Sequence, residues 1–387
     1  MMSSSTHTLR QALATVYDPE LRQPITELGM VDLAVVEQGT AYVTILLTVE
    51  GCPLRARIEE QVRAAALSLK DVEAVELEID YMNAQQREQL RQKLGYRREN
   101  PFTRPDSLTQ VYAVVSGKGG VGKSSMTANL AAALANRGLT VGLIDADIHG
   151  FSIPGILGLD QGPTRMDEMI LPPVLEAGQV QDQGGRQAAG CIKVISIGMF
   201  LASNQPVAWR GPMLHRALEQ FLTDVHFGAL DILLLDLPPG TGDIAISMAQ
   251  LLPQAGLLLV STPQQAAVEV AERAGTLSMQ TKQKVVGVIE NMAGLKLADG
   301  SVLDIFGSGG GELLAQRLTD SLGYPVPLLG SVPLDMQLRQ AGDAGGPLLW
   351  QYPDSAAARV IDQIAEGLAH RSRNLSGRQL PLHFSSR

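Results

Sequence analysis

The sequence predicts an α/β protein in which helices cover both faces of a parallel sheet, preceded by a small α+β domain. Apolar, strand-like runs alternate with helical patterns from residue 111 onward. A glycine-rich motif stands between the first of these strands and the first of these helices. A polar stretch ending in prolines separates this region from an earlier region of different composition. Continuous apolar strands separated by helices are typical of parallel sheets buried on both faces.

The chain is long enough for two domains. It has 387 residues, of which 45% are apolar and 18% charged, so it can bury a sizeable core. We expect a small α+β domain over residues 1–82, a linker over 83–107, a second domain over 108–372 and a C-terminal tail over 373–387.

The first domain is expected to begin with a helix that ends near Asp18-Pro19. The runs GMVDLAVVEQ and TAYVTILLTV then flank a turn at Gln38-Gly39, as the strands of a hairpin do. A helical pattern, RARIEEQVRAAALSL, and a strand pattern, VEAVELEID, follow. The linker, NAQQREQLRQKLGYRRENPFTRPDS, is expected to contain a short helix.

The second domain opens with SGKGGVGKSS, residues 116–125, which fits G-x-x-x-x-G-K-[ST] at Gly117, Gly122, Lys123 and Ser124. In this motif, backbone N–H groups surround phosphate oxygens, the lysine reaches the β- and γ-phosphates, and the serine hydroxyl binds Mg²⁺. The motif follows a strand-like run, VYAVV, and precedes an Ala/Leu-rich helical pattern. This order predicts the phosphate-binding loop of an ATP-binding P-loop protein.

Polar residues close several later strands, which are expected in TVGLIDAD, KVISIG, DILLLDLPPG, GLLLVST, KVVGVIEN and VPLLGSVP. Ligands bind at the carboxyl ends of parallel strands, so the residues there are candidates for the site. Asp236 is expected beside Mg²⁺. Asp145 and Asp147 project to opposite faces of an extended chain, and we favour Asp147 as the one that faces the nucleotide. A turn or cap role is the alternative for each residue.

Composition excludes some classes of function. The net charge of −9 argues against broad nucleic-acid binding, and two cysteines argue against a disulfide framework. The start, MMSSSTHTLRQAL, lacks the pattern of a secretion signal, and no apolar run is long enough for a membrane span. We therefore expect a cytoplasmic protein without a membrane span and without a nucleic-acid partner.

The loop also carries a second lysine, Lys118, and resembles the deviant phosphate loop of the group that contains MinD, ParA and the nitrogenase iron protein. The resemblance implies a homodimer with ATP between the subunits, in which Lys118 reaches the nucleotide of the partner. It also implies that the whole loop binds the nucleotide: Gly117, Lys118, Gly119, Gly120, Val121, Gly122, Lys123, Ser124 and Ser125.

Within that group the chain resembles the Mrp/ApbC-type iron–sulfur cluster carriers, because DADIHGFSIPGILG, SIGMF, WRGPML, DLPPGTGD, ENMAG, FGSGGGE and GSVPLD occur in that family's order. The first domain, with DPELRQPITELGMV and TVEGCP, is similar to the SufT/PaaD-like domain. The resemblance implies ATP hydrolysis and cluster transfer to apoproteins together with assembly factors. It implies that Asp147 orients water, Asp236 lies beside magnesium, Asp243 ends switch II, and Asn291 and Asp335 lie at the adenine base.

One departure from that family concerns the cluster. The family's C-x-x-C pair after ENMAG is absent, since the segment here is GLKLADGSVLDIFGSGG. Only Cys52 and Cys191 remain. Cys52 precedes Pro53, a favoured first helical residue, so its thiol is expected at a helix N-terminus, either as a transient cluster ligand or as a half-buried structural cysteine. Cys191 is expected to be a packed residue at a strand edge.

A cluster-free ATPase that acts as a nucleotide switch in positioning or partner recruitment, as MinD and ParA do, is the alternative function. An ATP-driven electron donor is a third class, which needs cluster cysteines inside the ATPase domain. A cluster carrier in which any iron–sulfur cluster is bound transiently remains the leading hypothesis.

Overall fold

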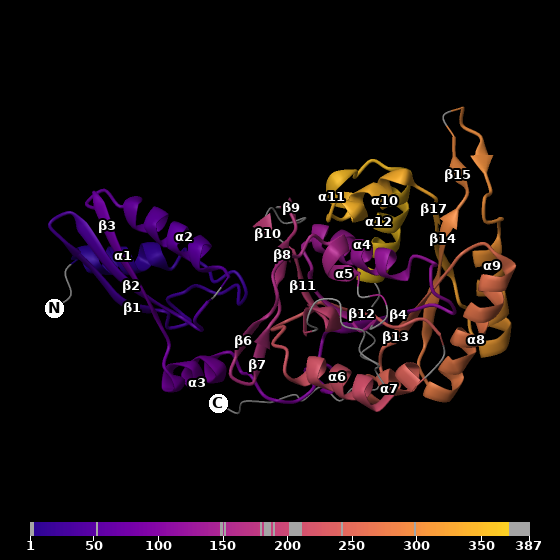
Figure 1. Cartoon of the computed structure of the whole chain (residues 1–387), viewed down its shortest axis with the longest axis horizontal. Helices are drawn as coiled ribbons and strands as arrows, with labels where there is room; N and C mark the ends of the chain where they lie inside the picture. The colour runs from indigo at the N-terminus through magenta and orange to yellow at the C-terminus, as the bar shows by residue number, and fades with distance from the viewer. Residues whose placement is uncertain are drawn as a thin grey trace, which may run out of the picture. The chain divides into compact units, whose positions relative to one another are not determined.

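The computed structural model describes residues 4–51, 53–147, 150, 152–178, 180–181, 187–188, 190–200, 211–240, 243–297 and 299–370. The predictions for Cys52 and for the tail at 373–387 lie outside these residues. The chain forms two compact units (Figure 1). The first consists of Met1–Arg98, Gln161–Val174 and Asp224–Gly228, and the second consists of Glu99–Asp160, Leu175–Thr223 and Ala229–Arg387.

The first unit contains a three-stranded sheet in the order β1-β2-β3. The strands are β1 (Val31–Glu37), β2 (Thr40–Leu47) and β3 (Ala74–Tyr81), and β2 pairs antiparallel with β1 and parallel with β3. The turn between β1 and β2 has positive φ at both Gln38 and Gly39, as two-residue hairpins require. Helices α1 (Ser4–Leu13) and α2 (Arg55–Leu67) share a hydrophobic core with the sheet. The order of elements predicted for this region is confirmed, although α1 ends at Leu13 rather than near Asp18-Pro19.

Residues 83–98 belong to the compact first unit, although their composition suggested a linker. Helix α3 (Ala84–Lys93) begins with a capping box between Asn83 and Gln86, and its Leu90 is buried in the core of the unit. A short hairpin from the middle of the chain, β6 (Thr164–Met166) and β7 (Met169–Leu171), also belongs to this unit. The sequence analysis did not predict this hairpin.

The second unit contains an eight-stranded sheet in the order β17-β14-β13-β4-β12-β5-β11-β8. The ladders from β17 to β11 are all parallel, which confirms the predicted α/β fold. The strands are β4 (Gln110–Val115), β5 (Thr140–Asp145), β8 (Val174–Glu176), β11 (Cys191–Ser196), β12 (Ile232–Asp236), β13 (Gly256–Ser261), β14 (Val285–Ala293) and β17 (Leu328–Pro333).

Helices cover both faces of this sheet (Figure 1). On one face α4 (Lys123–Asn136) and α12 (Ala356–Ala369) pack against alternate strand residues, such as Val114 and Leu258. On the other face α8 (Gln265–Thr281) and α9 (Gly310–Leu322) pack together over Leu259, where Gly275 allows close approach. The remaining elements are η1 (Pro101–Thr103), α5 (Ile153–Ile156), β9 (Val180–Gln181), β10 (Gln187–Ala188), η2 (Ile197–Phe200), α6 (Gly211–Thr223), α7 (Asp243–Leu251), β15 (Leu295–Lys296), β16 (Val302–Leu303), α10 (Met336–Asp343) and α11 (Leu348–Gln351).

The register of the central strands brings acidic residues together. Asp236, at the end of β12, lies opposite Asp145 on β5, and on its other side it lies opposite Val114 on β4. The loop at 116–122 follows β4 directly, so both carboxylates lie beside it. In the described part of the chain, no helix combines the length and the apolar character that a membrane crossing needs.

Candidate functional site

At two glycines of the loop between β4 and α4, any larger side chain would force the neighbouring atoms to move. Gly122, with φ of +82°, is the N-cap of α4, and a Cβ there would lie 2.2 Å from Asn291 Nδ2. A Cβ on Gly117 would lie 2.4 Å from the carbonyl carbon of Val270. The loop backbone is therefore packed closely on β14 and α8, with its turn conformation set by glycine.

The loop lines an open pocket of about 400 Å³. The pocket is lined by the loop and by two other segments, the one after β5 and the one after β12. These lining residues are Ser116, Lys118, Gly119, Gly120, Val121, Gly122, Lys123, Ser124, Ser125, Asp147, Gly150, Ser152 and Pro239. The pocket is thus formed at the carboxyl ends of the central strands, as the sequence predicted.

Lys123 is buried at the base of this pocket. Its Nζ lies 2.8 Å from Asp236 Oδ2 and 3.6 Å from Asp147 Oδ2, and its side chain is 5% exposed. The 2.8 Å contact with Asp236 lacks the angles of a hydrogen bond, so among the described residues the ammonium has ion-pair partners but no hydrogen-bond partner. A buried ammonium with unused donors is suited to bind an anion that enters the pocket.

Asp236 connects the loop helix to the sheet. Its Oδ2 accepts a hydrogen bond of 2.6 Å from Ser124 Oγ, and its Oδ1 accepts one of 2.8 Å from Thr127 Oγ1. The hydroxyl and the carboxylate are hard oxygen ligands, the type that Mg²⁺ prefers. The donor set therefore fits a magnesium ion beside Ser124, which lines the pocket. Thr127 was not predicted as a site residue. Its position one helical turn after Lys123 places it on the same face of α4, which could have indicated it.

Asp145 and Asp147 have different surroundings. Asp145 is fully buried; its Oδ2 accepts from Ser196 Oγ and its Oδ1 from the Asp147 amide. Burial, with the nearby charge of Asp236, raises the pKa of Asp145 to about 7. Asp147 lines the pocket, and Asp145 is not among the lining residues. Of these two carboxylates, Asp147 is therefore the one that a ligand in the pocket could contact.

Lys118 is held within its own chain. Its Nζ donates a hydrogen bond of 2.9 Å to Oε1 of Gln264, which directly precedes α8. The lysine is half-buried and lines the pocket. Sequence reasoning did not single out Gln264, because nothing in the local pattern distinguishes it from other polar residues after a strand.

Asn291 and Asp335 make structural contacts. Asn291 Nδ2 donates a hydrogen bond of 2.8 Å to the Val121 carbonyl, so this residue fixes the loop backbone. Asp335 caps α10 by accepting from the Gln337 amide, and it accepts a second, longer bond from the amide of Ala357. The role of both residues at an adenine base stays a prediction.

The cysteines provide little for a resident metal site. Cys191 lies in β11 and is fully buried with a free thiol. Helix α2 begins at Arg55 with Leu54 as its N-cap, so Pro53 precedes the helix. The position predicted for the Cys52 thiol lies outside the described residues. The cysteine-free segment after Asn291 forms the β15–β16 hairpin. Among the residues that the structure describes, no three His, Cys, Asp or Glu side chains are grouped to hold a metal ion.

Comparison with protein families gives two matches along the chain. Residues 107–369 match the family described as NUBPL iron-transfer P-loop NTPase. Residues 6–92 match the family described as iron-sulfur cluster assembly protein. Together these matches cover both the phosphate-loop region and the N-terminal region.

Curated proteins of similar sequence share one name. A protein of Mycobacterium tuberculosis named iron-sulfur cluster carrier protein is 54% identical over 378 residues, which cover 97% of this chain and 96% of the relative. A protein of Synechocystis with the same name is 38% identical over 368 residues, which cover 94% of this chain and 97% of the relative.

Among solved structures, a nucleotide-binding protein from Archaeoglobus fulgidus in complex with ADP is 35% identical to this chain. The match covers 65% of this chain and 92% of that protein, with a TM-score of 0.52. That region of the chain therefore shares the fold of a protein that holds ADP.

Proposed function

Because the chain belongs to the family of NUBPL-type iron-transfer P-loop NTPases, we propose that it binds and hydrolyses ATP and carries iron–sulfur clusters to apoproteins. Lys123 carries the nucleotide part of this proposal. Its buried ammonium lies at the base of the loop pocket without a hydrogen-bond partner among the described residues. The β- and γ-phosphates of ATP would supply the missing acceptors.

The residues around Lys123 would have different roles in ATP hydrolysis. Ser124 and Asp236 would hold Mg²⁺, which, when bound, neutralises negative charge on the phosphates. Asp147 would orient a water molecule toward the γ-phosphate. Attack by that water breaks the bond between the γ-phosphorus and the bridging oxygen, and it releases ADP, phosphate and a proton.

Dimer formation would complete the site. We propose that Lys118 leaves Gln264 and binds the nucleotide of a second copy of this chain. The hydrogen bond of 2.9 Å between Lys118 and Gln264 joins a charged donor to a neutral acceptor. A phosphate is the stronger acceptor for an ammonium, so it can replace the glutamine when two copies meet.

In this proposal the iron–sulfur cluster is cargo, and the chain itself offers few cysteine ligands for it. The chain has two cysteines, and Cys191 is fully buried, which leaves Cys52 as the thiol that we propose to hold a cluster transiently. The region around Cys52 lies within the match to the iron-sulfur cluster assembly family. A client apoprotein, an assembly factor or a small thiol would supply the other ligands.

Lys123→Ala tests the nucleotide site. We expect the substitution to abolish ATP hydrolysis and to weaken ATP binding by about 100-fold or more, because it removes the cation that meets the phosphates. Lys70→Ala, which changes an exposed lysine of the first unit, is the control and should behave as wild type. Circular dichroism checks that both variants are folded, and hydrolysis by Lys123→Ala at the wild-type rate would overturn the proposal.

A further inference from the structure

The β6–β7 hairpin lies inside the span of the P-loop NTPase match, yet it belongs to the first compact unit. Residues 99–160 before it and 175–223 after it belong to the second unit. The chain therefore leaves the second unit, forms part of the first, and returns. Neither β6 nor β7 is a strand of the eight-stranded sheet.

The hairpin contributes to the hydrophobic core of the first unit. Met166, Met169 and Leu171 are each no more than 1% exposed. They belong to the same cluster of buried side chains as Leu9 of α1 and Leu90 of α3. Because these side chains are fully buried there, the hairpin is a structural part of the unit rather than a loop resting on its surface.

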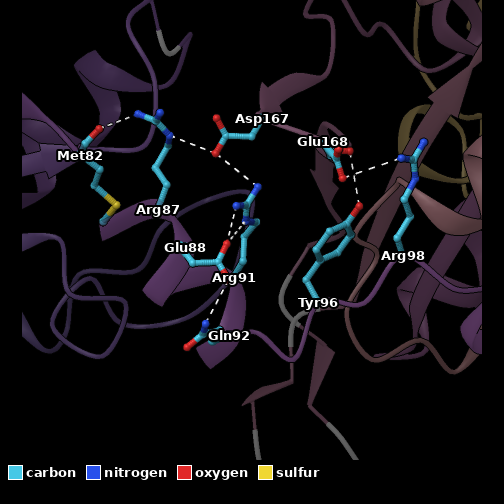
Figure 2. Close-up of polar contacts among 9 residues, drawn as sticks. All are labelled: Met82, Arg87, Glu88, Arg91, Gln92, Tyr96, Arg98, Asp167 and Glu168. Atoms are coloured by element: carbon cyan, nitrogen blue, oxygen red, sulfur yellow. Dashed lines mark hydrogen bonds and ion pairs between the residues drawn. The ribbon is translucent and has the colours of Figure 1, made fainter. Parts of the chain in front are cut away.

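The turn of the hairpin is clamped by two arginines of α3 (Figure 2). Asp167 Oδ2 lies 3.2 Å from Arg87 Nε and 3.3 Å from Arg91 Nη1. Arg87 is itself held by a hydrogen bond from Nη1 to the Met82 carbonyl at 2.7 Å, and Arg91 also pairs with Glu88 (Figure 2). The clamp thus joins the turn to a helix that precedes it by about 80 residues along the chain.

Both strands of the hairpin are fixed as well. Thr164 Oγ1 donates a hydrogen bond of 2.6 Å to the buried Glu20. Ile170 exchanges backbone hydrogen bonds with Asp224 and His226. The carboxylate of Asp224 in turn accepts two bonds from Arg98, at 3.0 Å and 3.3 Å. The turn and both strands are therefore anchored within the first unit.

The chain that leads into the hairpin starts at the phosphate-loop pocket. Asp147, Gly150 and Ser152 line this pocket. Ile153 and Leu157 are then buried in the core of the second unit, and seven residues after Leu157 the chain reaches Thr164 in the first unit. The described part of the segment between the pocket and the hairpin is therefore short and partly buried.

We propose that the β6–β7 hairpin is a docking element that links nucleotide occupancy at the pocket to the first unit, through the clamp of Arg87 and Arg91 on Asp167. This rests on the proposed nucleotide site. Asp147 Oδ2 lies 3.6 Å from the ammonium of Lys123. Phosphates compete for Lys123 and repel the Asp147 carboxylate, so nucleotide binding shifts the start of the segment that ends in the clamped hairpin.

Hydrogen exchange of the full-length protein, with and without Mg²⁺ and a slowly hydrolysed ATP analogue, tests this. We expect the analogue to protect amides at 117–125 and to change the exchange rates of amides at 84–93 and 164–171 by threefold or more. Protection at 117–125 with no change at 84–93 and 164–171 would overturn the docking role alone. No protection at 117–125 would overturn the nucleotide site and the docking role together.

Asp167→Asn provides the matched test of the clamp. Asp167 has φ of +54°, a conformation that asparagine also tolerates, so the turn is retained while both ion pairs lose their charge. We expect this variant to keep protection at 117–125 and to lose the nucleotide-dependent change at 84–93. Glu168→Gln, on the same turn and largely exposed, should retain both responses. A full response at 84–93 in Asp167→Asn would contradict the role of the clamp, and the wild-type comparison decides the proposal should this variant unfold.

Discussion

Ser124 Oγ donates a hydrogen bond of 2.6 Å to Asp236 Oδ2, which joins the first turn of α4 to the end of β12 across 112 residues of sequence. The same carboxylate oxygen lies 2.8 Å from Lys123 Nζ. One buried aspartate therefore aligns the two loop residues that we assign to magnesium and to phosphate. Contacts within the chain therefore hold this part of the loop in place, which lowers the cost of ordering it for a ligand.

Asp147→Ala separates turnover from binding. Asp147 lines the pocket near Lys123, and we assign it to the orientation of water, which contributes in the transition state. We expect hydrolysis to fall by about 100-fold while the dissociation constant for ATP changes by less than about threefold. Steady-state hydrolysis and equilibrium binding of a fluorescent ATP analogue measure the two quantities. A loss of affinity as large as the loss of turnover would show that Asp147 serves binding.

Lys118→Ala and Gln264→Ala test the proposed movement of Lys118 between chains. Lys118→Ala should leave nucleotide affinity of the monomer nearly unchanged and weaken the ATP-dependent dimer, because its proposed partner is a phosphate of the second copy. Gln264→Ala removes only the acceptor that holds Lys118 within its own chain, so the dimer should form at least as tightly as in wild type.

Sedimentation velocity with a slowly hydrolysed ATP analogue distinguishes these outcomes for Lys118 and Gln264. If Lys118→Ala forms the dimer as tightly as wild type, Lys118 has no role in the partner's site. If both variants weaken the dimer equally, the bond between Lys118 and Gln264 is part of the closed state instead.

Glu20 makes the first unit sensitive to pH. Burial raises the pKa of this carboxyl from 4.5 to about 7, with a further contribution from the charge of Asp18 and an opposing one from the hydrogen bond of Thr164. Between pH 4.5 and about 7 the folded unit holds a proton that the unfolded chain releases, so its stability falls as pH rises through this window. The full shift corresponds to about 3 kcal/mol.

Glu20→Gln should remove this dependence and stabilise the first unit above pH 7, because the neutral amide still accepts the bond from Thr164. Asp145 gives the second unit a dependence of the same sign, since its pKa is also raised to about 7. Global unfolding would combine the contributions of Glu20 and Asp145. Amide exchange at residues 16–30, corrected for intrinsic rates, therefore measures the pH dependence due to Glu20 better. The exposed Glu27→Gln is the control. If the pH dependence of stability persists unchanged in Glu20→Gln, it arises from another titratable group.

Local signals account for most of what the sequence predicted. The apolar strands, the helix after the loop and the turn at Gln38-Gly39 each depend on residues adjacent in sequence. Asp236 and Asp147 were chosen as candidates because parallel strands bring their carboxyl ends to one edge, and the structure places both near Lys123. The β6–β7 hairpin was missed because its strands of three residues are too short to show a period, and its burial depends on α1 and α3.

Contacts between distant residues explain the other differences. The bond from Lys118 to Gln264 spans 146 positions, and the one from Asn291 to Val121 spans 170. The local sequence around each of these residues does not show which distant partner it meets. Residues 83–98 were placed in a linker because they are polar. In the structure α3 contributes only Leu90 to the buried core, and its arginines bind Asp167 of the hairpin.

Cluster binding by Cys52 is the central claim, and anaerobic reconstitution with iron and sulfide tests it most directly. Wild type, Cys52→Ser and Cys191→Ser are compared by iron content and absorption spectra, in the presence of a small thiol, with ATP hydrolysis measured in parallel. We predict that wild type and Cys191→Ser bind a labile cluster, and that Cys52→Ser binds none while it hydrolyses ATP at nearly the wild-type rate. A stable four-iron cluster in a variant lacking both cysteines, or no iron in wild type even with an apoprotein client present, would contradict the account.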